Sequence, residues 1–256
     1  RYSQVRILAP QIKEKQVKVK AVILAAGKGT RMKSDLPKVL HPLLGRPLLS
    51  HVIENIRSAG ITDITVVVGY EGDSVISAIG SGVNYVWQRE QLGTGHAVLM
   101  AKNALADFDG GVLIACGDAP LVSPQSFRNL EFDSPELKGS VLTMIAENPH
   151  GYGRIVRGNS GVSEIVEEKD ASDEQRTIKE VNTGTYIFDS KLLFEALSNI
   201  GNSNAQNEYY LPDVVKYINA KGYAVQGIVL DDPVEGSGVN SPEELARLES
   251  RMTVKG

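Results

Sequence analysis

The stretch LAAGKGTRMKSDLPKVL, residues 24–40, decides the fold because it joins a short apolar run to a loop rich in glycine and basic side chains. The run VKAVILAA at 19–26 is typical of a fully buried strand, since it is apolar without alternation. Gly27 and Gly29 follow at once, and glycines without a Cβ let backbone N–H groups approach an anion closely. The stretch therefore predicts a strand that ends in a phosphate-binding loop.

Two common phosphate-loop patterns fail at one position. Gly27 and Gly29 match the first two glycines of G-x-G-x-x-G, but Met32 stands at the third. The Walker A pattern, counted from Gly27, also requires glycine where Met32 stands. The loop is therefore neither a dinucleotide fingerprint nor a P-loop.

Two cations of the loop are candidates for charge stabilisation. Arg31 offers a planar fork for an oxyanion, and Lys38 offers a compact positive charge. Pro37 restrains Leu36 to extended geometry, which helps to aim the loop. The alternative is a surface turn with solvated charges, and the DLPKVL segment after the glycines favours the binding role over that alternative.

Short apolar runs alternate with amphipathic stretches on either side of this loop. Strands are expected at 64–70, 83–88 and 110–118, and helices at 48–60, 71–82 and 93–105. This alternation predicts a parallel sheet, in which ligands bind at the carboxyl ends of the strands. The loops 25–38, 88–95 and 117–120 should therefore lie together.

The second half of the chain is less regular. We expect strands at 139–148, 152–158, 161–170, 178–189 and 224–230, with helices at 190–200, 210–222 and 241–252. Ser241 suits the N-cap of the last helix, and Pro242 suits its first turn. The predicted class is α/β, with a mostly parallel mixed central sheet, helices on both faces and a smaller sub-lobe.

Composition excludes several classes of protein. The net charge of −4 argues against binding of a nucleic-acid polymer, which usually requires a basic face. Cys116 is the only cysteine, so no internal disulfide forms and nothing points to an oxidising compartment. No apolar run approaches the ~20 residues that span a membrane. Residues 1–19 are basic and have no predicted role.

The loop and the motifs that follow it resemble the sugar-1-phosphate nucleotidyltransferases. The similarity begins at LAAGKGTRMKSDLPKVLHPLLGRPLL and is strongest to the uridylyltransferases that make UDP-N-acetylglucosamine. It continues in order through residues 20–250, in the segments QLGTGHA (91–97), GDAPL (117–121), GYGRIV (151–156), IVEEKDASDEQ (165–175), EVNTG (180–184), NEYYLPD (207–213) and GVN (238–240).

The resemblance implies a Rossmann-like nucleotidyltransferase domain over residues 20–252 and a cytoplasmic enzyme of cell-wall precursor synthesis. The implied substrates are UTP and N-acetylglucosamine-1-phosphate, with pyrophosphate as the leaving group and Mg²⁺ as the cofactor. Some relatives carry a further acetyltransferase domain of hexapeptide repeats, which also makes them trimers. We expect no such domain in this chain, and its oligomeric state stays open.

Four groups of residues acquire roles from the resemblance. Arg31 and Lys38 would contact the phosphates during the reaction. Asp118 and Asn240 would bind Mg²⁺, which accepts carboxylate and carbonyl oxygens together with substrate phosphates. UTP would be bound by Leu24, Ala25, Ala26, Gly27, Gly29, Gln88, Gly93 and Thr94. The sugar would be bound by Gly117, Gly153, Glu167 and Asn182.

Simpler interpretations of three of these residues remain. Asp118 precedes Pro120 and could serve only the turn, Asn240 could be an ordinary polar residue before a helix, and Glu167 could be a solvated strand end. Two positions also depart from the family. Cys116 replaces a frequent bulky aromatic residue, and Glu168 replaces a frequent histidine.

Other functions compete with nucleotidyl transfer to the N-acetylated sugar. A glycosyltransferase of similar architecture often uses Asp-x-Asp at a strand end, and DFD at 107–109 fits those letters but precedes the strand at 110–118. A binding module without catalysis would not need both Arg31 and Lys38 or the metal pair. Relatives that use CTP, dTTP or another sugar are further alternatives.

Overall fold

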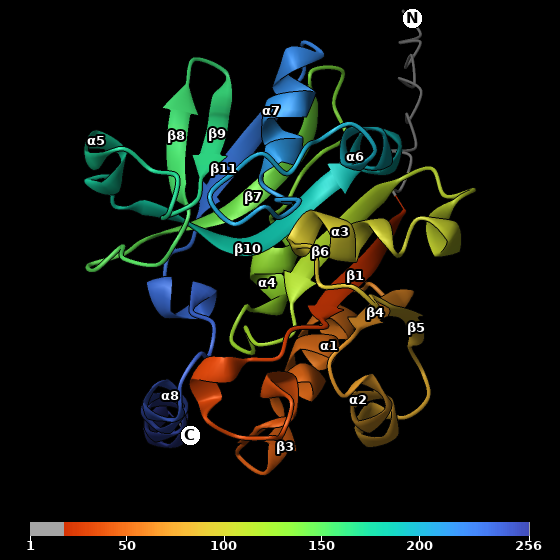
Figure 1. Ribbon diagram of the computed structural model, residues 1–256, viewed down its shortest axis with the longest axis vertical. Helices are drawn as coiled ribbons and strands as arrows, with labels where there is room; N and C mark the ends of the chain where they lie inside the picture. Colours follow the sequence, from red (N-terminus) through yellow and green to blue (C-terminus); the bar gives the residue numbers. More distant parts are fainter. Residues whose placement is uncertain (1–17, 256) are drawn as a thin grey trace, which may run out of the picture.

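The computed structural model describes residues 18–255, which form a mixed sheet covered by helices on both faces (Figure 1). The strands of the main sheet lie in the order β11-β7-β10-β6-β1-β4-β5, and the hairpin β8–β9 joins it through β10. The bounds are β1 Val19–Ala25, β4 Ile64–Val68, β5 Asn84–Trp87, β6 Gly111–Cys116, β7 Leu137–Ile145, β8 Arg154–Gly158, β9 Gly161–Val166, β10 Glu180–Asp189 and β11 Ala224–Val229. A separate small hairpin comprises β2 Pro42–Leu43 and β3 Arg46–Pro47.

The strand directions place the predicted loops at one edge. β1 pairs in parallel with β4 and β6, and β4 pairs in parallel with β5, whereas β10 runs antiparallel between β6 and β7. The carboxyl ends of β1, β5 and β6 therefore share one edge of the sheet. The mixed, mostly parallel α/β class is confirmed, including helices on both faces.

The helices are α1 Leu48–Ser58, α2 Gly72–Ile79, α3 Thr94–Leu99, α4 Pro124–Arg128, α5 Asp173–Arg176, α6 Ser190–Leu197, α7 Asp213–Ala220 and α8 Pro242–Lys255. Short 3-10 turns occupy Thr30–Met32, Lys38–Leu40, Asn103–Leu105 and Pro233–Gly236. The expected cap of α8 is present, since Ser241 Oγ accepts from Glu244 N at 3.2 Å.

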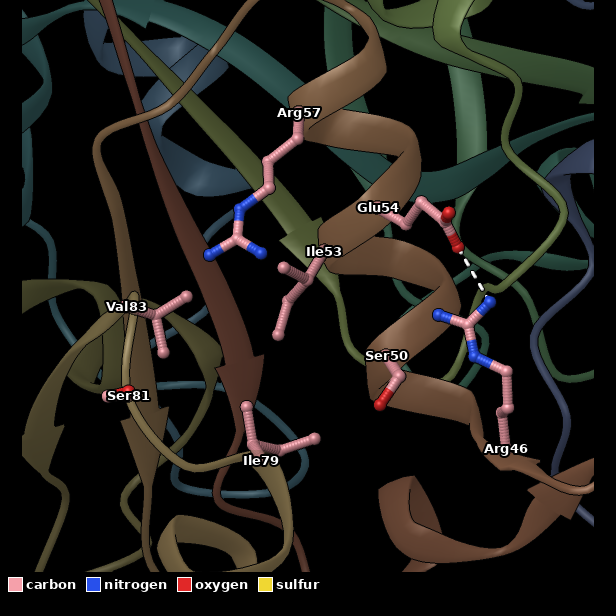
Figure 2. Close-up of a pocket in the computed structure, with 8 residues that line it drawn as sticks. All are labelled: Arg46, Ser50, Ile53, Glu54, Arg57, Ile79, Ser81 and Val83. Atoms are coloured by element: carbon pink, nitrogen blue, oxygen red, sulfur yellow. Dashed lines mark hydrogen bonds and ion pairs between the residues drawn. The ribbon is translucent and has the colours of Figure 1, made fainter.

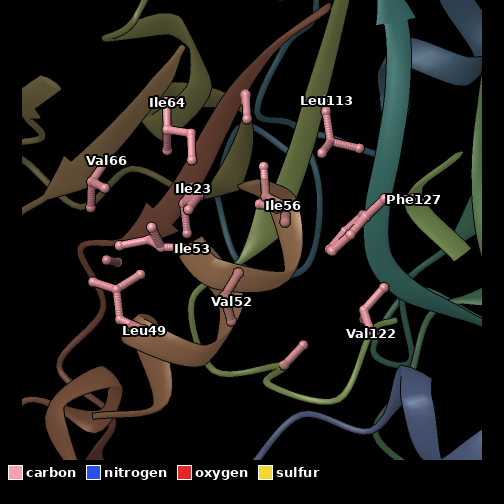
Figure 3. Packing of buried hydrophobic residues seen from close by; sticks show 14 of the residues in the cluster. Ile23, Leu49, Val52, Ile53, Ile56, Ile64, Val66, Leu113, Val122 and Phe127 are labelled. Carbon is pink, nitrogen blue, oxygen red and sulfur yellow. The ribbon is translucent and has the colours of Figure 1, made fainter. Parts of the chain in front are cut away.

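One face of the sheet packs on α1. Leu49, Val52, Ile53 and Ile56 recur at helical spacing on α1 and point toward the strands (Figure 3). They meet Ile23 of β1, together with Ile64, Val66 and Leu113 of the neighbouring strands, and all of these residues are buried. This packing gives the β1 loop a rigid base.

The opposite face packs on α3, α6 and α7. Alternation along β1 sends Val22 to this side, whereas Ala21 and Ile23 face α1. Val98, Leu193 and Val214 of the three helices join the same cluster, which also contains Ile155 and Ile165 of the β8–β9 hairpin. The hairpin, with α5, projects from the sheet as a small sub-lobe (Figure 1).

A third apolar cluster ties the glycine loop to the C-terminal segment. Met32 is buried and packs with Leu43, Leu48, Val239 and Leu248. The residue that breaks the two phosphate-loop patterns thus anchors the loop to the segment before α8.

One predicted helix is shorter than expected. The pattern predicted a helix over 93–105, but α3 ends at Leu99 and a 3-10 turn covers Asn103–Leu105. The backbone tightens after α3, because Ala101 N bonds to Val98 O and Lys102 N bonds to Leu99 O, three residues back in each case. The periodic pattern alone does not reveal this change of pitch.

Two other expectations from the sequence concern the N-terminal segment and membrane-spanning helices. The basic segment 1–19 falls almost wholly outside the described residues, and β1 already begins at Val19. Within residues 18–255, no helix is both long and apolar enough to cross a bilayer.

Candidate active site

Two cations, a carboxylate and an amide meet at the carboxyl edge of the sheet. Lys38 Nζ forms an ion pair with Asp118 Oδ2 and donates to Asn240 Oδ1 at 2.9 Å. Arg31 Nη2 donates to the same Asn240 oxygen at 2.7 Å. The four residues come from three distant parts of the chain, and we call them the charge cluster.

Local packing brings these parts together. Gly29 has a left-handed φ of 64°, and a Cβ there would lie 2.5 Å from Lys38 Cβ, so only glycine lets the loop fold back on Lys38. Val239 N donates to Asp118 O at 2.9 Å, which seats the segment before α8 beside the end of β6. Asn240 is thereby placed opposite Lys38.

The charge cluster has oxygen atoms that suit a divalent cation. Asp118 Oδ2 and Asn240 Oδ1 both contact one ammonium group, so two oxygen ligands already converge around a positive charge. Hard cations such as Mg²⁺ prefer such oxygens and complete their shell with water and phosphate. The donor set therefore fits the predicted Mg²⁺.

A cavity of about 320 Å³ opens beside the charge cluster. Lys38 and Asp118 lie on its wall, which adjoins the ends of β1 and β5. Seven of the eight residues predicted to bind UTP line it, namely Leu24, Ala25, Ala26, Gly27, Gln88, Gly93 and Thr94. Gly29 is not among the lining residues and instead packs against the Lys38 side chain.

Gln88 is fixed at the wall of this cavity. Its side chain is buried, and Nε2 donates to Gly93 O at 3.0 Å and lies 3.2 Å from His96 Nδ1. These contacts fix the orientation of the amide at the cavity wall. Gln91, which the sequence did not single out, lines the same cavity and donates to Ala26 O at 2.8 Å.

Gly93 is required by close backbone packing. Its φ of 108° is in the region that favours glycine, and a Cβ would lie 2.7 Å from Tyr209 O. Thr94 Oγ1 accepts from Leu211 N at 3.1 Å, so the hydroxyl holds the 209–211 segment against the start of α3. These contacts shape the cavity from beneath.

We predict that Gly93→Ala lowers the free energy of unfolding by about 1–3 kcal/mol, because the backbone of Tyr209 must move or the strained φ must be relieved. Thermal denaturation measures this loss. If Gly93 binds UTP as the resemblance implies, the KM for UTP should rise with it. Gly80→Ala is the matched control, since Gly80 has a φ of 74° but a Cβ added there would meet no atom within 4 Å. Equal destabilisation by both substitutions would contradict the contact with Tyr209.

Three of the predicted sugar residues meet where the sub-lobe joins β10, and we call them the sugar group: Gly153, Glu167 and Asn182. A Cβ on Gly153 would lie 3.3 Å from Glu167 Oε1 and 3.6 Å from Asn182 Cβ. Asn182 N donates to Gly153 O at 2.9 Å, and Asn182 Nδ2 donates to the Tyr186 hydroxyl at 2.6 Å. Gly117, the fourth predicted residue, packs instead beneath the glycine loop, where its N–H donates to Leu24 O at 2.9 Å.

Glu167 occupies an unfavourable electrostatic environment. Burial raises the pKa of its carboxyl group above the usual range, and repulsion by Asp170, Asp213 and Glu208 raises it further. A raised carboxyl pKa means that the folded state binds the proton more tightly than the unfolded state does. The stability contributed by Glu167 therefore decreases as the pH rises from about its ordinary pKa through its raised pKa.

We predict opposite effects of Glu167→Gln on stability and on binding. At neutral pH the substitution removes an unfavourable charge, so the melting temperature should rise by about 2 °C or more, and this gain should shrink toward pH 4. If Glu167 binds the sugar phosphate as the resemblance implies, the KM for that substrate should increase about tenfold, because a hydrogen bond to a charged group is lost. A lower melting temperature at pH 7 would contradict the electrostatic argument.

Cys116 lies on the wall of the 320 Å³ cavity, which we call the nucleotide cavity, and also contacts β10. Its Sγ donates to Gly184 O at 3.6 Å, and burial beside Asp118 raises the pKa of the thiol to about 12. The thiol therefore stays neutral and packs as a small hydrophobic group at the end of β6.

Tyr152 is a residue that the sequence analysis missed. Burial raises the pKa of its phenol, the charges of Glu244 and Asp118 raise that pKa further, and the charge of Arg31 lowers it. Tyr152 directly precedes Gly153 and belongs to the turn that enters β8. Tyr152 belongs to the segment GYGRIV at 151–156, in which the resemblance assigned a role only to Gly153.

A second hollow, of about 360 Å³, lies between α1 and residues 79–83 (Figure 2). Arg46 pairs with Glu54 at 2.8 Å, and Arg57 donates to Gly82 O at 2.7 Å. Its lining residues, Arg46, Ser50, Ile53, Glu54, Arg57, Ile79, Ser81 and Val83, all differ from those of the nucleotide cavity.

The fold and the site define an α/β protein with a nucleotide-sized cavity and a cluster of charges at the carboxyl edge of its sheet. The sequence profile of the nucleotidyl transferase family matches residues 20–233, and the chain belongs to that family.

The chain is similar to bacterial proteins named bifunctional protein GlmU. It is 48% identical over 235 residues to that of Exiguobacterium sibiricum and 48% identical over 236 residues to that of Lactococcus lactis subsp. lactis. Each alignment covers 91% of this chain, but only 52% and 51% of the relatives. The chain thus spans about half the length of the curated relatives it matches.

A solved structure shares the fold. It is the crystal structure of a candidate glucose-1-phosphate thymidylyltransferase from Bacillus anthracis in complex with sucrose, and it superposes with a TM-score of 0.69 at 22% identity. The superposition covers 91% of this chain and 94% of the other.

Proposed function

We propose that this chain transfers a uridylyl group from UTP to N-acetylglucosamine-1-phosphate, giving UDP-N-acetylglucosamine and pyrophosphate. The observation that carries the proposal is the convergence of Arg31, Lys38, Asp118 and Asn240 at the mouth of the nucleotide cavity. Membership of the nucleotidyl transferase family and similarity to GlmU support it. The proposal places the reaction in the cytoplasm, where UTP is available.

The proposed reaction requires no protein nucleophile. A phosphate oxygen of the sugar phosphate forms a bond to the α-phosphorus of UTP, and the bond from that phosphorus to the oxygen bridging the β-phosphorus breaks. The attacking oxygen is already ionised, so no proton has to be removed. Catalysis then depends on positioning and on neutralising negative charge.

The residues of the chain divide these tasks. The nucleotide cavity holds UTP with its base toward Gln88 and its phosphates toward Gly27 and the charge cluster. Arg31 and Lys38 stabilise negative charge on the phosphates, and Gly153, Glu167 and Asn182 bind the sugar. Asp118 and Asn240 would hold Mg²⁺, which when bound neutralises charge on the phosphate oxygens.

The glycosyltransferase alternative has no support in the fold. The DFD segment at 107–109 precedes β6, so it lies at the opposite edge of the sheet from the charge cluster. Asp109 pairs there with Lys191 at 2.9 Å.

One assay tests the proposal. The protein is incubated with Mg²⁺, UTP and N-acetylglucosamine-1-phosphate, and pyrophosphate release is measured over time. Parallel reactions replace the sugar phosphate with glucose-1-phosphate or UTP with CTP or dTTP. If pyrophosphate release is fastest with UTP and N-acetylglucosamine-1-phosphate, the proposal is supported. Faster release with another pair would assign the enzyme that other substrate specificity, and no release with any pair would contradict catalysis.

A further inference from the structure

Among the residues whose side chains the structure describes, Arg154 is the largest that is fully buried, and it carries a charge. It begins β8, directly after Gly153 of the sugar group, and only 2% of its surface is exposed. A buried guanidinium is costly unless its charge is paired and its donors are bonded. The Nη1 and Nη2 groups of Arg154 have partners, whereas Nε has none among the described residues.

Those contacts connect two segments that flank the sugar group. Arg154 Nη2 donates to Glu168 Oε2 at 2.7 Å, and Nη1 donates to Tyr152 O. Glu168 Oε2 also accepts from Gly151 N at 3.1 Å. The pair therefore hydrogen-bonds the turn Gly151–Gly153 at two points, the N–H of Gly151 and the carbonyl of Tyr152.

Glu168 is itself held in place from the other side. Arg176 Nε lies 3.7 Å from Glu168 Oε1, and Arg176 Nη2 bonds to Glu168 O at 3.5 Å. Glu168 directly follows Glu167 in the chain, so the residue that hydrogen-bonds the turn is the neighbour of the acidic residue of the sugar group. The Arg154 bond lowers the pKa of Glu168, which stays ionised at neutral pH.

We propose that Arg154 and Glu168 form a positioning pair that sets the turn Gly151–Gly153, and with it Tyr152, for the sugar phosphate. The Asn182 N–H donates to Gly153 O at 2.9 Å and holds the end of the turn, while the pair holds Gly151 and Tyr152. The pair can therefore act through the turn, and neither of its side chains needs to touch the substrate. This inference rests on the proposed function for its kinetic consequences, but the contacts can be tested without substrate.

A second arginine–glutamate pair on the same strand provides a matched control. Arg157 Nε donates to Glu180 Oε2 at 2.9 Å, which also links β8 to β10. Glu180 accepts in addition from Thr143 Oγ1 at 2.7 Å, and neither residue contacts the turn through any hydrogen bond given for the described residues. Glu180→Gln therefore repeats the chemical change away from the turn.

The kinetic test compares Glu168→Gln with Glu180→Gln. We expect Glu168→Gln to raise the KM for N-acetylglucosamine-1-phosphate about 10- to 100-fold and to change the KM for UTP less than about twofold, because a small displacement of a positioning element weakens one subsite selectively. Glu180→Gln should change neither KM. An equal rise for both substrates, or equal effects of the two substitutions, would overturn the proposal.

Arg154→Lys tests the geometry of the guanidinium. Lysine keeps the charge but cannot donate to Glu168 and Tyr152 O through a planar fork. It should reproduce the effect of Glu168→Gln, and the double substitution should add little, since both changes disrupt one unit. Strict additivity of the two effects on KM would contradict a pair.

Hydrogen exchange tests the pair without any substrate. The Gly151 amide should exchange at least about tenfold faster in Glu168→Gln than in the wild type, whereas Glu180→Gln should leave it unchanged. Unchanged exchange would overturn the positioning role even if turnover is normal. Faster exchange in a protein that fails to turn over UTP would support the pair and contradict only the proposed function.

Discussion

Arg31→Ala should reduce kcat by about 10³- to 10⁵-fold while the protein remains folded, because an arginine that stabilises charge in phosphoryl transfer acts mainly in the transition state. Arg31 is exposed, and its one hydrogen bond given by the structure goes to Asn240 Oδ1 at 2.7 Å. Its loss should therefore change the free energy of unfolding by only about 0.5 kcal/mol. Steady-state pyrophosphate release and thermal denaturation measure the two quantities separately.

Arg46→Ala is the control for this experiment. Arg46 is an exposed arginine whose side chain is 52% accessible and pairs with Glu54 at the second hollow. It should leave kcat within about twofold of the wild type, as expected for a surface residue away from the site. A kcat near the wild-type value in Arg31→Ala, with this control also normal, would remove Arg31 from the catalytic group.

The sequence predicted the part of the site that is local in the chain. Gly29, Arg31 and Lys38 lie within ten residues, and the strand before them fixes where they emerge from the sheet. Gly153, Glu167 and Asn182 were named only through the family resemblance, and the structure brings them close together. The sequence alone could not predict that these residues lie close together, because their positions depend on how β8 of the hairpin pairs with β10.

The meaning of Met32 also required the structure. Because Met32 stands where two phosphate-loop motifs require glycine, the sequence excluded those motifs. The structure shows that Met32 is buried against Val239 and Leu248. Asn240 reaches Lys38 because this packing holds the C-terminal segment beside the loop. Long-range packing of this kind leaves no periodic trace in sequence, and the contacts of Arg154 with Glu168 could not be predicted for the same reason.

Asp118→Asn should reduce turnover by about 10²- to 10³-fold at saturating substrates and should raise the Mg²⁺ concentration needed for half-maximal rate. Asparagine has nearly the same shape, so the cavity should keep its form. It replaces one anionic oxygen with an N–H₂ group, which can neither bind a cation nor pair with Lys38. Lys38 still has the Asn240 oxygen at 2.9 Å, so the loop should remain folded.

A magnesium titration separates this role from the simpler one of a turn residue. Asp63→Asn is the matched control, because Asp63 also pairs with a lysine, Lys20 at 2.8 Å, but precedes β4 at the opposite edge of the sheet. The control should show the wild-type dependence on Mg²⁺. If Asp118→Asn lowers the melting temperature yet keeps the wild-type rate and Mg²⁺ dependence, Asp118 serves only the turn before Pro120, and the metal assignment fails together with that of Asn240.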